Sequence, residues 1–335
     1  MSPTQAGGAV DLNVIHPSPL DSVAAAHETI AALRRRSLFF VGGMPKSGTT
    51  WLCLLLDAHP MISCRGEGHF LTSLAPRLRT ALAEHSNYVK HKSATIFAGL
   101  DNYPSFRDTH LQYLLGAAMS LLMVQTAGDA PIVGEKTPDN VLAFNELGLL
   151  FPDARFLNLV RDGRDCAVSA WFHNLRLNPD RTKEAFPDFA AFAGTFAKLW
   201  TASIDAGSGF ANLNPGRCLT IRYENLKRAP EIELARVLVF LGADADPDAV
   251  RRCVDAASFE RLSGGRAPGE EDRGSFFRIG VAGDWRRHFT QDALAAFEAG
   301  GGLALRRCGY VTDEPRLAAG TGGEEMVRSQ NESLR

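Results

Sequence analysis

The chain has 335 residues, enough for one large α/β domain or two smaller ones. Its formal net charge of -2, from 36 basic and 38 acidic residues, gives no bulk attraction to nucleic acid or to an anionic membrane, so an anion site has to be built locally. No apolar run approaches the roughly 18 residues of a membrane span, and the six cysteines lack zinc-site spacing, so we expect a cytoplasmic protein with reduced thiols.

The first elements in the chain predict a phosphate-binding loop. Residues 1–36 mix Gly, Pro and Ser with an Ala-rich stretch, and we expect a loose arm with a helical turn or more. Residues 37–43, SLFFVGG, are typical of a buried parallel strand that leads into a turn. Residues 49–58, TTWLCLLLDA, are predicted to be helical. A strand, a glycine loop and a helix N-terminus in succession form a natural cradle for phosphate.

Further along the chain, three runs are predicted to be strands: residues 131–136, 155–162 and 217–224. Helical patterns separate them, at residues 111–124, 140–150, 165–175, 186–206 and 231–241. This alternation predicts a three-layer α/β fold, a parallel sheet flanked by helices on both faces. Ligands of such sheets bind at the carboxyl ends of the strands, so we expect the Gly43 loop, Lys136 and Arg161 on one rim.

Two stretches near the C-terminus lack a regular pattern. Residues 263–283 are rich in Gly and charge, and a loop of this length inside a compact domain usually closes over a ligand or stays disordered. Residues 312–335 have the composition of a disordered tail. We therefore predict a single folded domain over residues 37–311.

The loop in FFVGGMPKSGTTW differs from an ATP-binding loop at one position. Gly43 and Gly48 have the separation found in G-x-x-x-x-G-K-[ST], but Thr49 stands where that loop has lysine. The nearby lysine is Lys46, inside the loop. Backbone N–H groups from Ser47 to Thr50 and the Ser and Thr hydroxyls are suited to one terminal phosphate, with Lys46 beside its bridging oxygen. This pattern favours a ligand with one 5'-phosphate and a transferable group over a triphosphate with Mg²⁺.

The segment PKSGTTW resembles the 5'-phosphosulfate loop of sulfotransferases that use 3'-phosphoadenosine 5'-phosphosulfate (PAPS). The resemblance continues at FLNLVRDGRDCAVS, which is similar to the strand, turn and helix that bind the 3'-phosphate in that family. It implies that Arg161 and Ser169 are phosphate ligands. A guanidinium at a strand end is suited to a bidentate phosphate contact. Taken alone, an arginine and a helix serine would more often be surface residues.

Three further segments extend the resemblance. FFRIGVAGDWRRHFT is similar to a C-terminal segment that clamps the 3'-phosphate, which implies this role for Arg278 and Gly280. Tyr223 matches a tyrosine that contacts the nucleotide, and Trp51 and Phe259 match two aromatic residues that hold the adenine ring between them. Without the resemblance, ordinary core packing would be the better explanation for these three aromatic residues.

The acceptor side resembles tyrosylprotein and carbohydrate sulfotransferases and bacterial members, through GEKTPDN and LDAHPMISCRGEGHF. This resemblance implies that Glu67 is the catalytic base. His69 is a rival, because side chains alternate along the extended GHF segment and either residue could face the acceptor. The alternative interpretation is that Glu67 is a surface loop residue. A carboxylate serves as a base if its surroundings raise its pKa toward the working pH. Lys136 would stabilise the sulfonate oxygens while Lys46 stabilises the leaving oxygen.

The sequence therefore predicts transfer of a sulfonyl group from PAPS to a hydroxyl of a carbohydrate or small-molecule acceptor. The second product is adenosine 3',5'-bisphosphate, no metal is required, and no nucleic-acid partner or membrane span is expected. The oligomeric state and the acceptor stay open. Two alternatives are an ATP-dependent phosphotransferase with a degenerate P-loop and a catalytically silent nucleotide-binding protein of the same fold.

Overall fold

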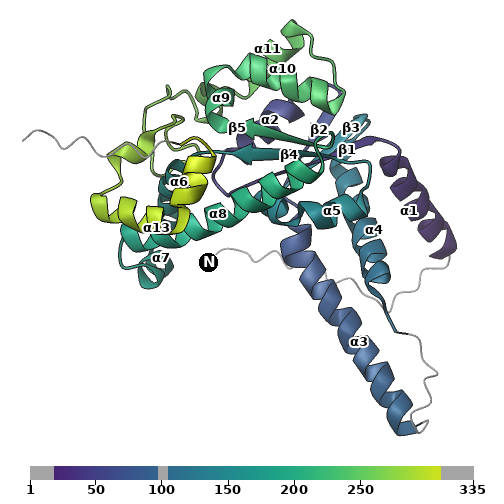
Figure 1. The fold of residues 1–335 in the computed structure, drawn as a ribbon. Helices are drawn as coiled ribbons and strands as arrows, with labels where there is room; N and C mark the ends of the chain where they lie inside the picture. The colour runs from purple at the N-terminus through teal and green to yellow at the C-terminus, as the bar shows by residue number, and fades with distance from the viewer. Residues whose placement is uncertain (1–18, 97–104, 311–335) are drawn as a thin grey trace, which may run out of the picture.

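The computed structural model describes residues 19–96 and 105–310 of the chain. A five-stranded sheet in the order β2-β3-β1-β4-β5 crosses its centre, and every strand pair is parallel (Figure 1). The strands are β1 (Ser37–Gly43), β2 (Ile62–Cys64), β3 (Ile132–Lys136), β4 (Arg155–Val160) and β5 (Cys218–Arg222). The predicted α/β fold with a parallel sheet is confirmed.

Helices of several lengths connect and follow the strands. They are α1 (Pro19–Arg34), α2 (Thr49–Asp57), the π-helix η1 (Phe70–Leu74), α3 (Ala75–Ile96), α4 (Asp108–Ala127), the 3-10 helix η2 (Pro138–Ala143), α5 (Phe144–Leu150), α6 (Gly163–Leu177), α7 (Pro179–Ala185), α8 (Phe189–Leu213), α9 (Tyr223–Arg228), α10 (Pro230–Leu241), α11 (Pro247–Ala256), α12 (Phe259–Leu262), the 3-10 helix η3 (Asp284–Arg287) and α13 (Gln291–Arg307). No helix in the described residues is long and apolar enough to cross a membrane.

Alternation of side chains along β1 builds both faces of the sheet. Phe39 and Val41 pack in a core with α2, α10 and α11, whereas Phe40 packs in a second core with α1, α4, α5 and α8. Successive side chains of a strand point to opposite faces, and a run buried on both faces is accordingly apolar throughout. A third core lies between α6, α8 and α13. The three predicted layers are therefore present.

Several boundaries differ from the sequence predictions. The expected loose arm contains α1, whose Leu33 is fully buried in the second core. Tyr223 and Glu224 begin α9 instead of ending β5, and β2 was not predicted because three residues are too few for a pattern. The helix predicted over residues 140–150 is split into η2 and α5. The predicted tail, 312–335, lies outside the described residues.

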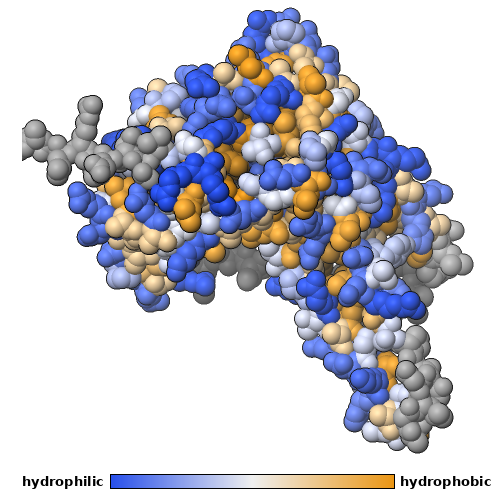
Figure 2. Space-filling view, in the orientation of Figure 1, coloured by the Kyte–Doolittle hydropathy of each residue, from blue (hydrophilic) through white to orange (hydrophobic). Residues whose placement is uncertain are grey.

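Helix α3 extends away from the sheet and its covering helices (Figure 1). Only Ala75 and Ser93 of its residues are buried, so it contributes little to the cores. The face of the molecule in Figure 2 is largely hydrophilic, with apolar side chains exposed in separate groups. Exposed apolar residues scattered in this way are normal for a protein surface.

Candidate functional site

The loop after β1 lies at the centre of the carboxyl-end rim of the sheet. β1 pairs with β3 on one side, where Val41 stands opposite Lys136, and with β4 on the other, where Gly43 stands opposite Leu159. The ends of β3 and β4 therefore flank the loop. The expectation that the loop, Lys136 and Arg161 share one rim is confirmed.

The backbone of the loop is shaped by two residues with positive φ. Lys46 has φ 71°, and Gly48, the N-cap of α2, has φ 103°. A Cβ atom at Gly48 would lie 2.7 Å from the ring of Tyr223, so the close approach of this ring also requires glycine. In the described chain no side chain caps α2, which leaves the N–H groups of its first turn open to an anion.

Ser47 has a different place from the one expected. Its N–H group donates to the C=O of Met44 at 3.0 Å and so closes the loop on itself, which removes it from the expected row of phosphate donors. Its hydroxyl is buried and has no hydrogen-bond partner within the described residues. Buried polar groups without partners are rare and call for an explanation such as a ligand.

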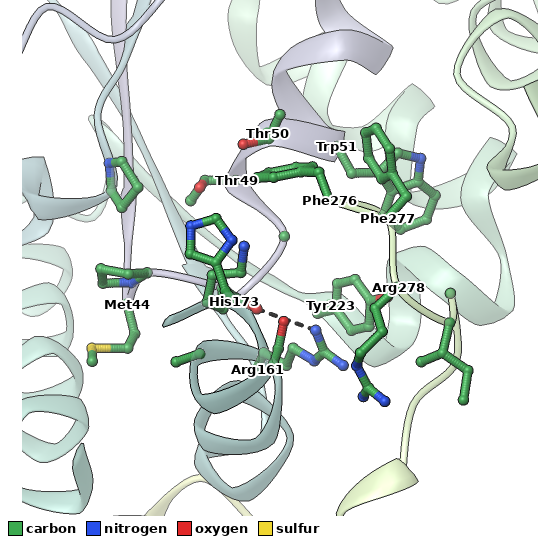
Figure 3. Close-up of a pocket in the computed structure, with 18 of the residues that line it drawn as sticks. Met44, Thr49, Thr50, Trp51, Arg161, His173, Tyr223, Phe276, Phe277 and Arg278 are labelled. Atoms are coloured by element: carbon green, nitrogen blue, oxygen red, sulfur yellow. Dashed lines mark hydrogen bonds between the residues drawn. The ribbon is translucent and has the colours of Figure 1, made fainter. Parts of the chain in front are cut away.

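A cavity of about 620 Å³ opens beside this loop and collects most of the predicted site residues (Figure 3). Its lining includes Lys46, Gly48, Thr49, Thr50, Trp51, Glu67, Arg161, Ser169, Tyr223, Phe259, Arg278 and Gly280. Ser47, His69 and Lys136 do not line it. An apolar part of the cavity is formed by Met44, Ala170, Phe186, Phe192, Phe196 and Leu199.

Glu67, Lys136 and Thr50 are in contact at one end of the cavity. The Lys136 ammonium forms an ion pair with the Glu67 carboxylate and donates a hydrogen bond of 3.2 Å to the Thr50 hydroxyl. The Lys136 side chain is only 5% exposed, whereas that of Glu67 is 35% exposed. His69 Nε2 lies 3.3 Å from the other Glu67 oxygen. The two candidate bases are thus neighbours, and Lys136 ties Glu67 to the N-terminus of α2.

The segment that carries Glu67 is held by Glu135, a residue to which the sequence analysis gave no role. The buried Glu135 carboxylate accepts hydrogen bonds from the Gly68 N–H at 2.9 Å, the Thr137 hydroxyl at 2.6 Å and the Asn140 amide at 2.6 Å. The signal in the sequence was a carboxylate at the end of an apolar strand. Such a residue needs several hydrogen-bond donors if it is buried.

Arg161 lines the cavity between two segments of the chain. Its guanidinium donates to the C=O of Lys46 at 3.1 Å and to the C=O of Val281 at 3.3 Å, and lies 4.2 Å from the ring centroid of Tyr223. Ser169 lines the same cavity from α6. Arg161 therefore bridges the loop after β1 and the segment before η3.

The aromatic end of the cavity contains Trp51, Tyr223 and Phe259. The Trp51 indole donates to the C=O of Ala257 at 2.9 Å and meets the Tyr223 ring edge-on, with centroids 5.8 Å apart. The ammonium of Lys227, which the sequence analysis did not single out, lies 5.7 Å from the Trp51 ring and 5.8 Å from the Phe259 ring. Burial and the charge of Arg161 lower the pKa of Lys227. A cation therefore lies near both rings.

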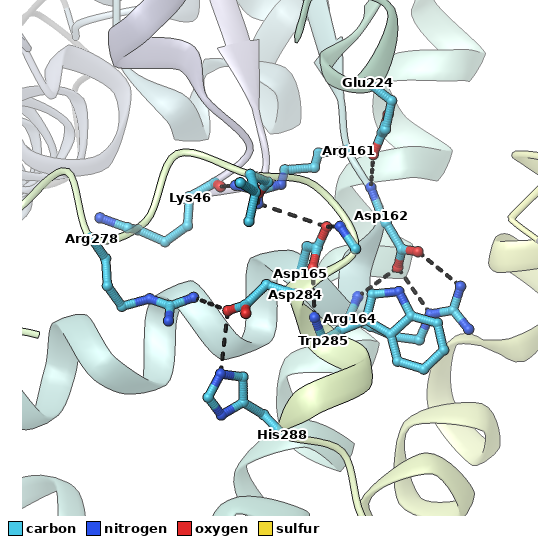
Figure 4. A network of polar contacts seen from close by, with 12 residues as sticks. Lys46, Arg161, Asp162, Arg164, Asp165, Glu224, Arg278, Asp284, Trp285 and His288 are labelled. Atoms are coloured by element: carbon cyan, nitrogen blue, oxygen red, sulfur yellow. Dashed lines mark hydrogen bonds and ion pairs between the residues drawn. The ribbon is translucent and has the colours of Figure 1, made fainter. Parts of the chain in front are cut away.

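Arg278 is paired with carboxylates at the edge of the cavity (Figure 4). Its guanidinium contacts Glu271 and Asp284, and Asp284 also lies 3.3 Å from His288 Nε2. Asp165 of α6 accepts from the N–H groups of Gly283 and Trp285, which fastens the segment to the fold. Residues 263–283 contain no helix or strand, as expected.

The charges around Lys46 disfavour its protonated form. Burial first, and then the guanidinium groups of Arg176 and Arg161, lower the pKa of Lys46 to about 8, while Glu67 acts in the opposite direction. Its ammonium lies 4.2 Å from the centroid of the Phe276 ring. A cluster of cations that repel one another is a favourable place for an anion.

Comparisons with known proteins agree on one family. The model of a family described as the sulfotransferase family matches residues 39–247. The human protein named protein-tyrosine sulfotransferase 1 is 34% identical over 139 residues, which cover 42% of this chain and 35% of the human protein. Cytosolic sulfotransferase 12 of Arabidopsis thaliana is 26% identical over 265 residues, 72% of this chain and 69% of that protein. The match thus spans only about a third of the human relative.

Two solved structures share the fold. A mouse sulfotransferase, SULT7A1, solved in complex with PAP, has a TM-score of 0.51 at 21% identity and covers 85% of this chain and 93% of its own. Sulfotransferase STF9 of Mycobacterium avium has a TM-score of 0.51 at 15% identity, over 86% of this chain and 80% of its own.

Proposed function

Because this chain belongs to the sulfotransferase family, we propose that it transfers a sulfonyl group from PAPS to an acceptor hydroxyl. The observation that carries the proposal is the contact of Lys136 with both Glu67 and the Thr50 hydroxyl. It joins a candidate base to an uncapped helix N-terminus, the place where a phosphosulfate is favoured.

The donor fits the chemistry of the cavity. The first turn of α2, which no side chain caps, supplies N–H donors for a 5'-phosphate, and Arg161 and Ser169 line the cavity and are suited to the 3'-phosphate. Trp51 and Phe259 would take the adenine ring, with Tyr223 beside it, and the Lys227 ammonium near both rings would have to leave room for it. The Arg278 guanidinium, which is paired with Glu271 and Asp284, would also have to contact the 3'-phosphate. Gly280 has no side chain and so leaves room for the Phe259 ring.

In the transfer step, an acceptor oxygen forms a bond to sulfur while the bond from sulfur to the 5'-phosphate oxygen breaks. The acceptor proton passes to the Glu67 carboxylate, and the electron pair of the broken bond stays on the leaving phosphate oxygen beside Lys46. When Glu67 becomes neutral, the Lys136 ammonium faces the sulfonate oxygens without its partner's charge. The products are a sulfate ester and adenosine 3',5'-bisphosphate.

The acceptor is proposed to be a carbohydrate or small-molecule hydroxyl, and a tyrosine hydroxyl is the second candidate. The apolar part of the cavity, with Phe186, Phe192 and Phe196, favours an acceptor with an apolar or aromatic body. The human relative is named a protein-tyrosine sulfotransferase, and tyrosine is a hydroxyl acceptor with an aromatic body. A panel of a simple phenol, a tyrosine peptide and an oligosaccharide, assayed with ³⁵S-labelled PAPS, separates these candidates.

Replacement of Glu67 tests the mechanism. We expect Glu67→Ala to lower turnover by about 10²- to 10⁴-fold, the range of a general base, while binding of adenosine 3',5'-bisphosphate changes little. His69→Ala serves as the matched variant, because His69 lies beside Glu67 and is the rival base. Full turnover in Glu67→Ala together with its loss in His69→Ala would transfer the role to His69.

Neither alternative is favoured by the site. An ATP-dependent phosphotransferase would lack its usual lysine, because Thr49 stands in that position. A silent nucleotide-binding protein has no need for Lys46, Glu67 and Lys136 around one cavity end. Labelled transfer from PAPS, with no phosphate transfer from ATP, is the expected result.

A further inference from the structure

His173 is a polar residue of the cavity to which the mechanism above gives no role. It lies on α6 one turn after Ser169, and both side chains line the cavity. Figure 3 shows its ring among the side chains that surround the cavity. The ring is also in edge contact with Phe276, with centroids 5.9 Å apart, and Phe276 in turn covers the Lys46 ammonium. His173 therefore belongs to the Lys46 end of the site.

The contact with Arg176 determines which ring nitrogen carries the proton. A guanidinium nitrogen of Arg176 lies 3.2 Å from His173 Nδ1. A guanidinium has only donors, so Nδ1 must accept this hydrogen bond and cannot carry a proton. The imidazole is then neutral, with its proton on Nε2. His173 Nε2 is therefore a hydrogen-bond donor, and the ring has no free lone pair with which to act as a base.

The surroundings keep the ring in this state. Burial, the Lys46 ammonium and the Arg176 guanidinium lower the pKa of His173 to about 4. A protonated imidazole would add a third positive charge and would break the hydrogen bond from Arg176. A neutral imidazole supplies a donor without adding to the repulsion around Lys46.

We propose that His173 binds the sulfonate group of PAPS, with its Nε2–H donating to a sulfonate oxygen next to Lys46. This inference rests on the proposed function and adds a residue that distinguishes the donor from its product, since the two nucleotides differ only in the sulfonate. Arg176 is a positioning residue, because it acts through the tautomer of His173. A donor fixed in place before the reaction stabilises charge on the transferring group without reorganisation.

The test compares the affinities of PAPS and adenosine 3',5'-bisphosphate by calorimetry without an acceptor. For His173→Ala we expect PAPS binding to weaken by about 10-fold or more, the size of one hydrogen bond to a charged group, and bisphosphate binding to stay unchanged. His173→Gln keeps an N–H donor and should recover part of the loss. An equal change for both nucleotides, or none for PAPS, would overturn the inference.

A second measurement does not depend on the nucleotides. Long-range ¹H–¹⁵N NMR of the histidine rings should show His173 as the Nε2–H tautomer between pH 5 and pH 8, and Arg176→Met should remove this preference and raise the pKa of the ring. An Nδ1–H tautomer or an imidazolium in the wild-type protein would contradict the proposal. If the wild-type protein bound neither nucleotide, the proposed function itself would be wrong. If it bound both nucleotides but the NMR showed another tautomer, only the role of His173 would be wrong.

Discussion

Lys46 has surroundings that disfavour its charge until an anion is present. Burial and the guanidinium groups of Arg176 and Arg161 lower its pKa to about 8. A bound 5'-phosphate would favour the ammonium and raise this pKa again. Binding of the nucleotide is therefore coupled to protonation of Lys46 in the pH range above about 7.

We expect nucleotide binding at pH 8 to take up about half a proton, because a group with a pKa near 8 is half protonated there and fully protonated in the complex. The affinity for adenosine 3',5'-bisphosphate should fall as the pH rises from 7 to 9. Calorimetry in two buffers of different ionisation enthalpy measures the uptake. Lys46→Arg is the control, since arginine stays protonated throughout, and it should show neither effect. The same heat of binding in both buffers for the wild-type protein would contradict this assignment.

The residues of the site could be predicted from the sequence only where a local pattern marks them. Lys46 lies in a glycine loop between a strand and a helix, Thr50 lies in the first turn of that helix, and Arg161 follows directly after a strand. The sequence carried no such signal for Lys227 and His173, because their surroundings are made by residues distant in the chain, such as Phe259 and Phe276. Contacts across a cavity depend on how several elements pack together, and this packing cannot be seen in a single sequence.

At the scale of elements, the segment between α12 and η3 covers one side of the cavity. It is joined to α6 by the hydrogen bond from Gly283 to Asp165, and Trp285 of η3 donates to the same carboxylate. Gly280 has φ 66°, and a Cβ atom there would lie 2.3 Å from the Phe259 ring. The conformation of this segment and the position of the aromatic ring are thus linked through one glycine.

Gly280→Ala tests this link. The substitution adds backbone strain of about 1–3 kcal/mol and displaces the Phe259 ring, so we expect weaker binding of adenosine 3',5'-bisphosphate and a lower melting temperature. Gly264→Ala is the matched control, because Gly264 has φ 79° but a Cβ atom there would meet no other atom within 4 Å. It should lower stability with little effect on binding. Equal affinities for the two variants would show that the Gly280 contact with Phe259 does not shape the nucleotide site.

Element boundaries followed from the sequence where the apolar pattern was strong. The run of residues 37–43 is β1 without change, since it is buried on both faces of the sheet. The end of β5 was placed too late, because Tyr223 is apolar enough to extend a strand pattern but packs from the start of α9 against Gly48. Helix α13 was not predicted, although Phe297 and Leu305 on it are fully buried.

At the scale of the whole molecule, the layers could be predicted and the extension of α3 could not. Alternating strands and helices specify a parallel sheet covered on both faces, and the three cores have this arrangement. Helix α3 buries few residues, so its direction is not encoded in an apolar pattern. The same overall architecture serves many phosphate-binding proteins, so the choice of nucleotide depends on the loop residues and not on the fold.

The central claim, that the cavity takes the nucleotide of PAPS and not ATP, is tested most directly by calorimetric titration with adenosine 3',5'-bisphosphate. A parallel titration with ATP and Mg²⁺ completes the comparison. The account predicts saturable binding of the bisphosphate that EDTA does not change, and no binding of ATP. Binding of ATP that requires Mg²⁺, with none of the bisphosphate, would contradict the roles of Arg161 and Ser169 and would favour a phosphotransferase.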